Sequence, residues 1–185
     1  MNAYSSKRNN CRLCGSSNLE LVAPIGLSPV SEKYLSKDSE DEQSITVPLD
    51  LHFCLKCFHV QLLDVVEPKY LWSDFTFETS RNPELVKHFQ QYSKQILNML
   101  ELAEHDLVLD VGSNDGTLLK CWLDQGYTSV LGVDPAKEIV ERANNDGLRT
   151  IEGFMNLDLA RGIVSTYGKA KLITANNVFA HVDDL

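Results

Sequence analysis

The spacing of hydrophobic and polar positions divides the chain into two parts of different character. Residues 11–68 are turn-rich, and the best alternating stretch, residues 45–53 (ITVPLDLHF), predicts a strand. Residues 36–44 (SKDSEDEQS) are charged and polar, which predicts a solvated loop. From residue 106 onward, short apolar runs alternate with amphipathic segments. The pattern therefore predicts a small N-terminal module followed by an α/β domain.

A long amphipathic helix is predicted between these two parts. Asn82 is a favourable N-cap, and Pro83 suits the first helical position. The apolar residues that follow at helical spacing are Leu85, Phe89, Tyr92, Ile96 and Leu100. We expect their common face to pack against the domain that follows.

The second part has the alternating order of a parallel α/β sheet. The expected strands are residues 107–111, 130–133, 148–151 and 171–175, and the expected helices are 116–125, 135–147 and 156–167. Such an order predicts helices on both faces of the sheet, as in a Rossmann-like domain. A doubly wound nucleotide-binding sheet carries about two or three more strands. We therefore expect a partial domain, truncated relative to a working enzyme.

Composition and charge exclude several classes of protein. Hydrophobic residues make up 43% and charged residues 23% of the 185 residues, as in a globular protein. No apolar run approaches the roughly 20 residues that cross a bilayer, and residues 1–10 lack the apolar core of a secretory signal. The formal net charge is −9 without a cluster of Lys and Arg, which disfavours a nucleic-acid partner. We expect a cytoplasmic protein without a membrane partner.

Four of the five cysteines form two C-x-x-C pairs, Cys11 with Cys14 and Cys54 with Cys57. Two intervening residues let both thiolates of a pair reach one metal ion from a tight turn. Two such pairs complete a tetrahedral, closed and therefore structural zinc site, which would stabilise a module with a small core. The alternative is four unrelated buried or redox-active cysteines.

Three further residues bear on this site. Gly15 supplies a permissive backbone after the first pair, while His52 and His59 flank the second pair as alternative ligands. Cys121 lies inside an expected helix, where a buried, small hydrophobic role is the simplest interpretation.

The segment 110–116 (DVGSNDG) lies where an expected strand turns into a helix. It lacks the G-x-G-x-x-G spacing of a dinucleotide-binding loop, and Asp110 and Asp115 would repel a pyrophosphate. Acidic residues suit a ligand that carries an ammonium and a sulfonium, which favours S-adenosylmethionine over NAD. Asp134 follows Gly112 by 22 positions, at the end of the next strand, where a carboxylate accepts hydrogen bonds from ribose hydroxyls. The alternative for Asp134 is an N-cap before Pro135.

Two segments give the chain a specific resemblance. LDVGSNDGTLL (residues 109–119) and ITANNVFAHVDDL (residues 173–185), together with the two cysteine pairs, resemble the sugar C-methyltransferase family. The resemblance covers nearly the whole chain and implies three parts. They are a four-cysteine zinc-binding module (residues 1–69), a connecting helical segment (70–103) and the N-terminal half of an S-adenosylmethionine-binding Rossmann-like domain (104–185).

The resemblance also implies a reaction and its residues. Members methylate a carbon of a keto-deoxysugar carried on a nucleoside diphosphate, by way of an enolate, and His181 matches the family's acid–base histidine. A further C-terminal region, or a partner, is expected to help hold the sugar nucleotide. The candidate cofactor-binding residues are Asp110, Gly112, Ser113, Asn114, Asp115, Gly116, Asp134 and Asn176.

The chain departs from the family in one segment. Family members often carry tyrosines before the long helix that reach the active site, whereas this chain has Phe75 and Phe77. Two other functions therefore stay open: an O- or N-methyltransferase on the same scaffold, and a non-catalytic zinc-ribbon and Rossmann-like binding module. A zinc-ribbon RNA methyltransferase is disfavoured by the acidic charge balance.

Overall fold

The computed structural model describes residues 4–31 and 45–184, which form two compact units. Unit 1 is Met1–Ser73 with Val182–Leu185, and unit 2 is Asp74–His181. The loop predicted at residues 36–44 lies outside the described residues. No helix in the described part of the chain has the length and apolarity needed to cross a bilayer.

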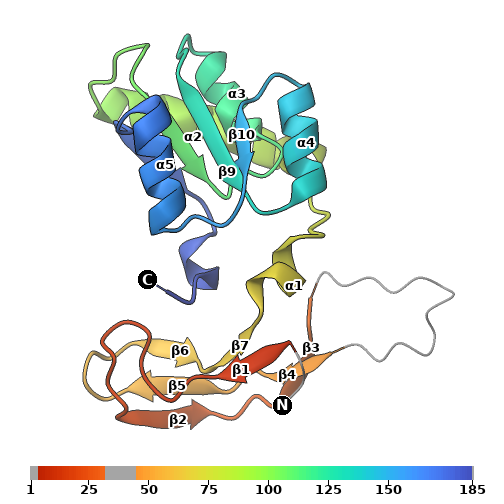
Figure 1. Cartoon of the computed structure of the whole chain (residues 1–185), viewed down its shortest axis with the longest axis vertical. Helices are drawn as coiled ribbons and strands as arrows, with labels where there is room; N and C mark the ends of the chain where they lie inside the picture. The colour runs from red at the N-terminus through yellow and green to blue at the C-terminus, as the bar shows by residue number, and fades with distance from the viewer. Residues whose placement is uncertain (1–3, 32–44, 185) are drawn as a thin grey trace, which may run out of the picture. The chain divides into compact units, whose positions relative to one another are not determined.

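Unit 1 is built from short antiparallel strands (Figure 1). A three-stranded sheet has the order β2-β5-β6, while β1 pairs with β7 and β3 pairs with β4. The strands are β1 (Ser5–Lys7), β2 (Leu19–Ala23), β3 (Leu27–Pro29), β4 (Thr46–Pro48), β5 (Leu51–Cys54), β6 (Val60–Leu62) and β7 (Asp64–Val66). The single helix among the described residues of this unit is α1 (Pro68–Trp72).

The strand predicted at residues 45–53 is two strands, β4 and β5, in different sheets. A corner at Leu49 and Asp50 separates them: the Leu49 N–H donates to the Gly26 carbonyl at 2.9 Å, and Asp50 Oδ1 accepts from the Gly26 N–H at 3.0 Å. The alternation of apolar and polar residues continues across this corner, so it gave no sign of the break. Periodicity indicates which side chains are buried, but it does not indicate which strand is the hydrogen-bonding partner.

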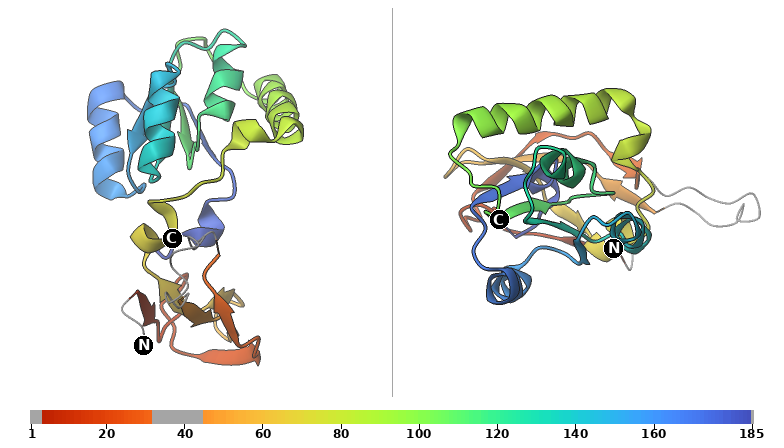
Figure 2. Two further views of the ribbon diagram at one scale, coloured as in Figure 1. Left: turned by 90° about the vertical axis from the view of Figure 1, so that its right-hand side faces the viewer. Right: turned by 90° about the horizontal axis from the view of Figure 1, so that it is seen from above.

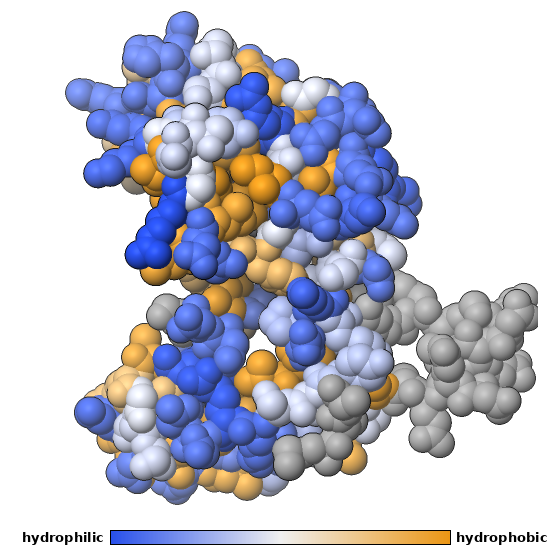
Figure 3. All heavy atoms as spheres, in the orientation of Figure 1, coloured by the Kyte–Doolittle hydropathy of each residue, from blue (hydrophilic) through white to orange (hydrophobic). Residues whose placement is uncertain are grey.

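Unit 1 has few buried apolar side chains to hold it together. The buried hydrophobic residues are Cys11, Val47, Cys54 and Leu63, and several larger apolar side chains are exposed, including Leu13, Ile25, Leu27 and Phe58. Figure 3 shows apolar side chains scattered among polar ones over the visible face. A core this small gives little stability by itself, which fits a module whose folding depends on a metal.

Unit 2 contains a parallel four-stranded sheet with the order β10-β9-β8-β11. Its strands are β8 (Val108–Val111), β9 (Val130–Asp134), β10 (Thr150–Glu152) and β11 (Leu172–Ala175). Its helices are α2 (Pro83–Met99), α3 (Thr117–Leu123), α4 (Lys137–Asn145) and α5 (Leu157–Tyr167), with short 3-10 helices η1 (Thr79–Arg81) and η2 (Phe179–His181). The predicted α/β fold class, with a four-cysteine module and a partial Rossmann-like sheet, is confirmed.

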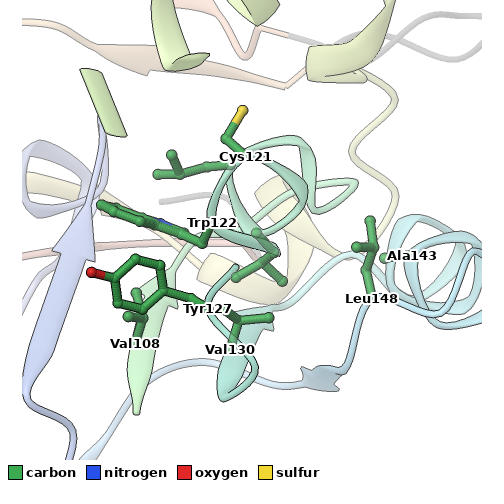
Figure 4. Close-up of a cluster of buried hydrophobic side chains, with 9 residues drawn as sticks. Val108, Cys121, Trp122, Tyr127, Val130, Ala143 and Leu148 are labelled. Carbon is green, nitrogen blue, oxygen red and sulfur yellow. The ribbon is translucent and has the colours of Figure 1, made fainter. Parts of the chain in front are cut away.

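Alternating strand residues place one hydrophobic core on each face of this sheet. Val108 belongs to the core that includes α3 and receives side chains from α2, whereas Leu109 belongs to the core that includes α5. Figure 2 shows α5 across the sheet from the other helices of this unit. Figure 4 shows Trp122 of α3 in the first core, where its ring meets Tyr127 edge-on at 6.1 Å between centroids. Cys121 is buried in the same core.

The two predicted helix starts have different outcomes. Asn82 caps α2, since its side chain accepts hydrogen bonds from the N–H groups of Glu84 and Leu85. Helix α4 begins at Lys137 and not at Pro135. Asp134 Oδ1 accepts from the Ala136 N–H at 2.9 Å, which keeps these residues in a turn before the helix. Because α2 packs on α3, it belongs to the same unit as the sheet; the three-part division at residues 69 and 103 stays a prediction.

Candidate functional site

The four cysteines of the two C-x-x-C pairs converge in unit 1. Their sulfur atoms all lie within 4.8 Å of one another, with 3.6 Å between Cys11 and Cys57 and 3.6 Å between Cys14 and Cys54. A tetrahedral zinc ion with bonds of about 2.3 Å places its sulfur ligands about 3.8 Å apart. Among the described residues, neither His52 nor His59 joins this group. The donor set and its spacing therefore fit zinc.

The two cysteine pairs adopt the same turn. The Gly15 N–H donates to the Cys11 carbonyl, and the Phe58 N–H donates to the Cys54 carbonyl, each at 2.8 Å. Both donors have a positive φ, 71° for Gly15 and 64° for Phe58. A glycine tolerates this backbone, but a bulky side chain there costs about 1–2 kcal/mol. The second turn is therefore the strained one of the two.

The electrostatics of the cluster require a counter-charge. Burial raises the pKa of Cys11, but the backbone N–H groups of Cys14 and Leu13 bring it down to about 6. The His59 N–H lowers the pKa of Cys57, yet burial and the three neighbouring sulfurs outweigh it and raise that pKa to about 12. Because the fourth thiol resists ionisation beside the others, a bound cation is needed to hold four thiolates.

Gln61 is a residue of this site that the sequence did not identify. It is 4% exposed, and its Oε1 accepts from the backbone N–H of Arg12 at 3.0 Å. The nearby Gln61 side chain also lowers the pKa of the Cys11 thiol. Gln61 is 50 residues from Cys11 in sequence, so no local pattern connects them. Such partners orient metal ligands and tune their basicity.

In unit 2, the loop 112–116 joins the carboxyl end of β8 to α3. Gly112 and Gly116 have φ of 70° and 78°. A Cβ added at Gly112 would lie 2.5 Å from Val178 Cγ2, so the segment after β11 packs directly on the loop. The structure thereby brings the loop next to the segment that leads to His181.

The Ser113 side chain is buried against β9. A Cβ added at Gly132 of β9 would overlap Ser113 Oγ, so the serine side chain occupies the space that Gly132 leaves. Ser113 is 4% exposed, and its Oγ has no hydrogen-bond partner among the described residues. Gly132 is a residue of this region that the sequence did not identify.

Asp110 and Asp134 are both buried carboxyl groups at the strand ends. Burial raises the pKa of Asp110 to about 7, although the Thr174 hydroxyl, which donates to its Oδ1 at 2.6 Å, lowers it. Burial also raises the pKa of Asp134, against hydrogen bonds from the backbone N–H groups of Ala136 and Asn114. The N-cap interpretation of Asp134 is wrong, because the N-cap of α4 is Ala136, two residues later.

The side chains of Asn114 and Asp115 are bonded to protein. Asn114 Oδ1 accepts from the N–H and the hydroxyl of Thr79, and its Nδ2 donates to the Phe77 carbonyl. Asp115 accepts from the Ser80 N–H and from Thr117. A cofactor role for these two residues would therefore use their backbone. The contacts with residues 77–80 span 35 to 37 residues, which local sequence patterns do not report.

The remaining predicted residues follow β11. Asn176 Nδ2 is buried and has no hydrogen-bond partner within residues 4–31 and 45–184. His181 ends η2, is exposed, and its backbone N–H donates to the Val178 carbonyl at 2.9 Å. Val178 thus contacts the loop through its side chain and His181 through its backbone.

Comparisons with known proteins agree with both parts of the chain. Residues 11–72 match a family model described as "Putative zinc binding domain". Over 177 residues, 96% of this chain, the sequence is 28% identical to C-methyltransferase NovU of Streptomyces niveus. The chain spans 42% of the length of that relative. These matches confirm the predicted resemblance to C-methyltransferases with an N-terminal zinc-binding domain.

Proposed function

We propose that this chain is part of an S-adenosylmethionine-dependent C-methyltransferase that acts on a nucleoside-diphosphate-linked keto-deoxysugar. The observation that carries the proposal is the cluster of polar groups at the carboxyl ends of β8, β9 and β11, where open α/β sheets bind ligands. The match to a C-methyltransferase over 96% of the chain supports the reaction type.

The residues at this edge fit the cofactor. Each carboxylate oxygen of Asp134 accepts one backbone N–H, from Asn114 and Ala136, which leaves a lone pair on each for the two ribose hydroxyls. The buried, unpartnered amide of Asn176 offers a donor at the same edge. Gly112 and Gly116 shape the loop, and Asp110, once it ionises above its pKa of about 7, suits a cationic ligand. When bound, S-adenosylmethionine supplies an electrophilic methyl group.

His181 is proposed as the base. A carbon next to a ketone becomes nucleophilic when a base removes its proton, and an imidazole suits this step near neutral pH. His181 would accept that proton, and S-adenosylmethionine held at Asp134 would supply the methyl group for the resulting enolate. His181 is exposed and lies three residues after Val178, the contact of Gly112, so it is accessible to a substrate at the loop.

Two measurements test this proposal. Calorimetric titration of the zinc-loaded full-length protein should show binding of S-adenosylhomocysteine and none of NADH. Substituting His181→Ala should abolish methyl transfer and leave the affinity for S-adenosylhomocysteine unchanged. His105→Ala is the matched control, because this exposed histidine precedes β8 and so lies at the opposite edge of the sheet. Full turnover by His181→Ala would exclude the histidine as the base.

One observation favours a second candidate, an O- or N-methyltransferase. Residues 71–91 contain no tyrosine, and Phe75 and Phe77 stand where family members often carry phenols. An oxygen or nitrogen acceptor is itself nucleophilic, so its methylation involves no enolate and does not need phenols to assist enolate formation. Assay of a keto sugar nucleotide against its reduced alcohol separates the two, since only an O-methyltransferase methylates the alcohol.

A further inference from the structure

The segment Phe77–Ser80, here called the strap, is fastened to the loop 112–116 by side chains of that loop. The Thr79 N–H and hydroxyl donate to Asn114 Oδ1 at 2.9 and 3.1 Å, and Asn114 Nδ2 donates to the Phe77 carbonyl at 2.8 Å. The Ser80 N–H donates to Asp115 Oδ2 at 2.8 Å. The Asn114 amide thus accepts from one backbone N–H of the strap and donates to one of its carbonyls, as the backbone of a neighbouring strand does in a sheet.

The backbone of Asn114 makes the second connection. Its N–H donates to Asp134 Oδ2 at 2.8 Å, and its φ is 52°. Asparagine is among the few residues that enter this left-handed region readily. The conformation that aims the N–H at Asp134 is also the one that aims the side chain at the strap. Residue 114 therefore joins the end of β9 to the strap.

The strap is also held from α4. Glu78 Oε1 lies 2.6 Å from Arg142 Nη1 and 2.7 Å from Arg81 Nη2. The Glu78 side chain is 14% exposed and Thr79 is 7% exposed, whereas Phe77 is 45% exposed. Two of the strap's side chains thus point into protein contacts, while that of Phe77 stays accessible to solvent.

We propose that Asn114 is a positioning residue that couples ligand binding at Asp134 to the order of the strap. This inference rests on the proposed function, because it takes the ligand at Asp134 to be the adenosyl cofactor. A ligand that fixes Asp134 favours the Asn114 conformation, and that conformation keeps the strap in place. The strap in turn holds the Phe77 backbone against the loop 112–116. Such coupling is reciprocal. If the bound ligand raises the equilibrium constant for ordering the strap by some factor, an ordered strap must raise the affinity for the ligand by the same factor.

The test compares amide hydrogen exchange and ligand affinity in full-length protein and in Asn114→Gly. Glycine keeps the positive φ and removes only the side chain. The amides of Thr79 and Ser80 should exchange at least about tenfold faster in the ligand-free variant, the effect of losing one to two net hydrogen bonds. S-adenosylhomocysteine should slow these amides in the parent protein, and its affinity should fall in the variant by a matching factor.

Asn144→Ala is the matched control. The Asn144 side chain also bridges two segments, but it does so at the outer strand β10. Its Oδ1 accepts from the Thr150 N–H, and its Nδ2 donates to the carbonyls of Thr150 and Val140. Its loss should leave exchange of Thr79 and Ser80 and the ligand affinity unchanged. Unchanged exchange of those two amides in Asn114→Gly would overturn the inference, as would unchanged affinity despite faster exchange. A parent protein that binds no S-adenosylhomocysteine would instead overturn the proposed function.

Discussion

Replacing Asp110 by asparagine should remove a large part of the pH dependence of stability in unit 2. The carboxyl group is 4% exposed, and its pKa rises from 3.8 to about 7 in the folded protein. Between these values the folded chain keeps a proton that the unfolded chain has released, so a rise in pH favours unfolding. The stabilising contribution is complete below about pH 4 and is lost as the pH rises through 7. At about 1.4 kcal/mol per pKa unit, the loss is on the order of 4 kcal/mol.

The Asp110→Asn side chain has no charge to bury and still offers an oxygen to the Thr174 hydroxyl. Urea unfolding between about pH 4 and pH 8, followed by the fluorescence of buried Trp122 in a Trp72→Phe background, measures the effect. The Asp110→Asn variant should equal the parent at about pH 4 and exceed it by about 4 kcal/mol at pH 8. Asp146→Asn, at an exposed carboxylate, should leave the parent's slope unchanged. Equal slopes for the parent and Asp110→Asn would refute the reasoning, because burial of this group would then carry no cost.

Two further predictions concern the zinc site and the packing of the loop. Metal analysis should find one zinc ion per chain. Because a closed site of this kind supplies folding free energy, Cys57→Ser or a chelator should unfold unit 1. Hydrogen exchange would then show loss of the protected amides of this unit. Gly132→Ala should lower the free energy of unfolding by about 1–3 kcal/mol in urea melts, because its Cβ would overlap Ser113 Oγ and lie 2.9 Å from Leu119 Cδ1. Gly162→Ala, in open space on α5, should show no such loss.

Local sequence patterns predicted those features that neighbouring residues determine. The strand and helix order of unit 2 followed from apolar runs of the right length, and Asn82 with Pro83 marked the start of α2. The C-x-x-C spacing fixed the metal ligands, because a tight turn brings two sulfurs together whatever the rest of the chain does.

Features set by distant residues were not predictable in this way. The corner that divides β4 from β5 depends on Gly26, more than twenty residues earlier. The bonds of Asn114 to the strap and of Gln61 to the Arg12 N–H, and the packing of Ser113 on Gly132, each join separate elements. Each of these side chains is polar or small and looks ordinary in its own neighbourhood, so only the fold reveals its partner.

The left-handed backbone at Phe58 makes the two halves of the metal site unequal. Both turns close with the same hydrogen bond, yet one uses glycine and the other forces an aromatic residue into an unfavourable region. The turn after Cys11 and Cys14 therefore closes without this strain, while the turn after Cys54 and Cys57 carries a cost of about 1–2 kcal/mol. Metal binding therefore has to offset backbone strain in the later half of the site, and none of this kind in the earlier half.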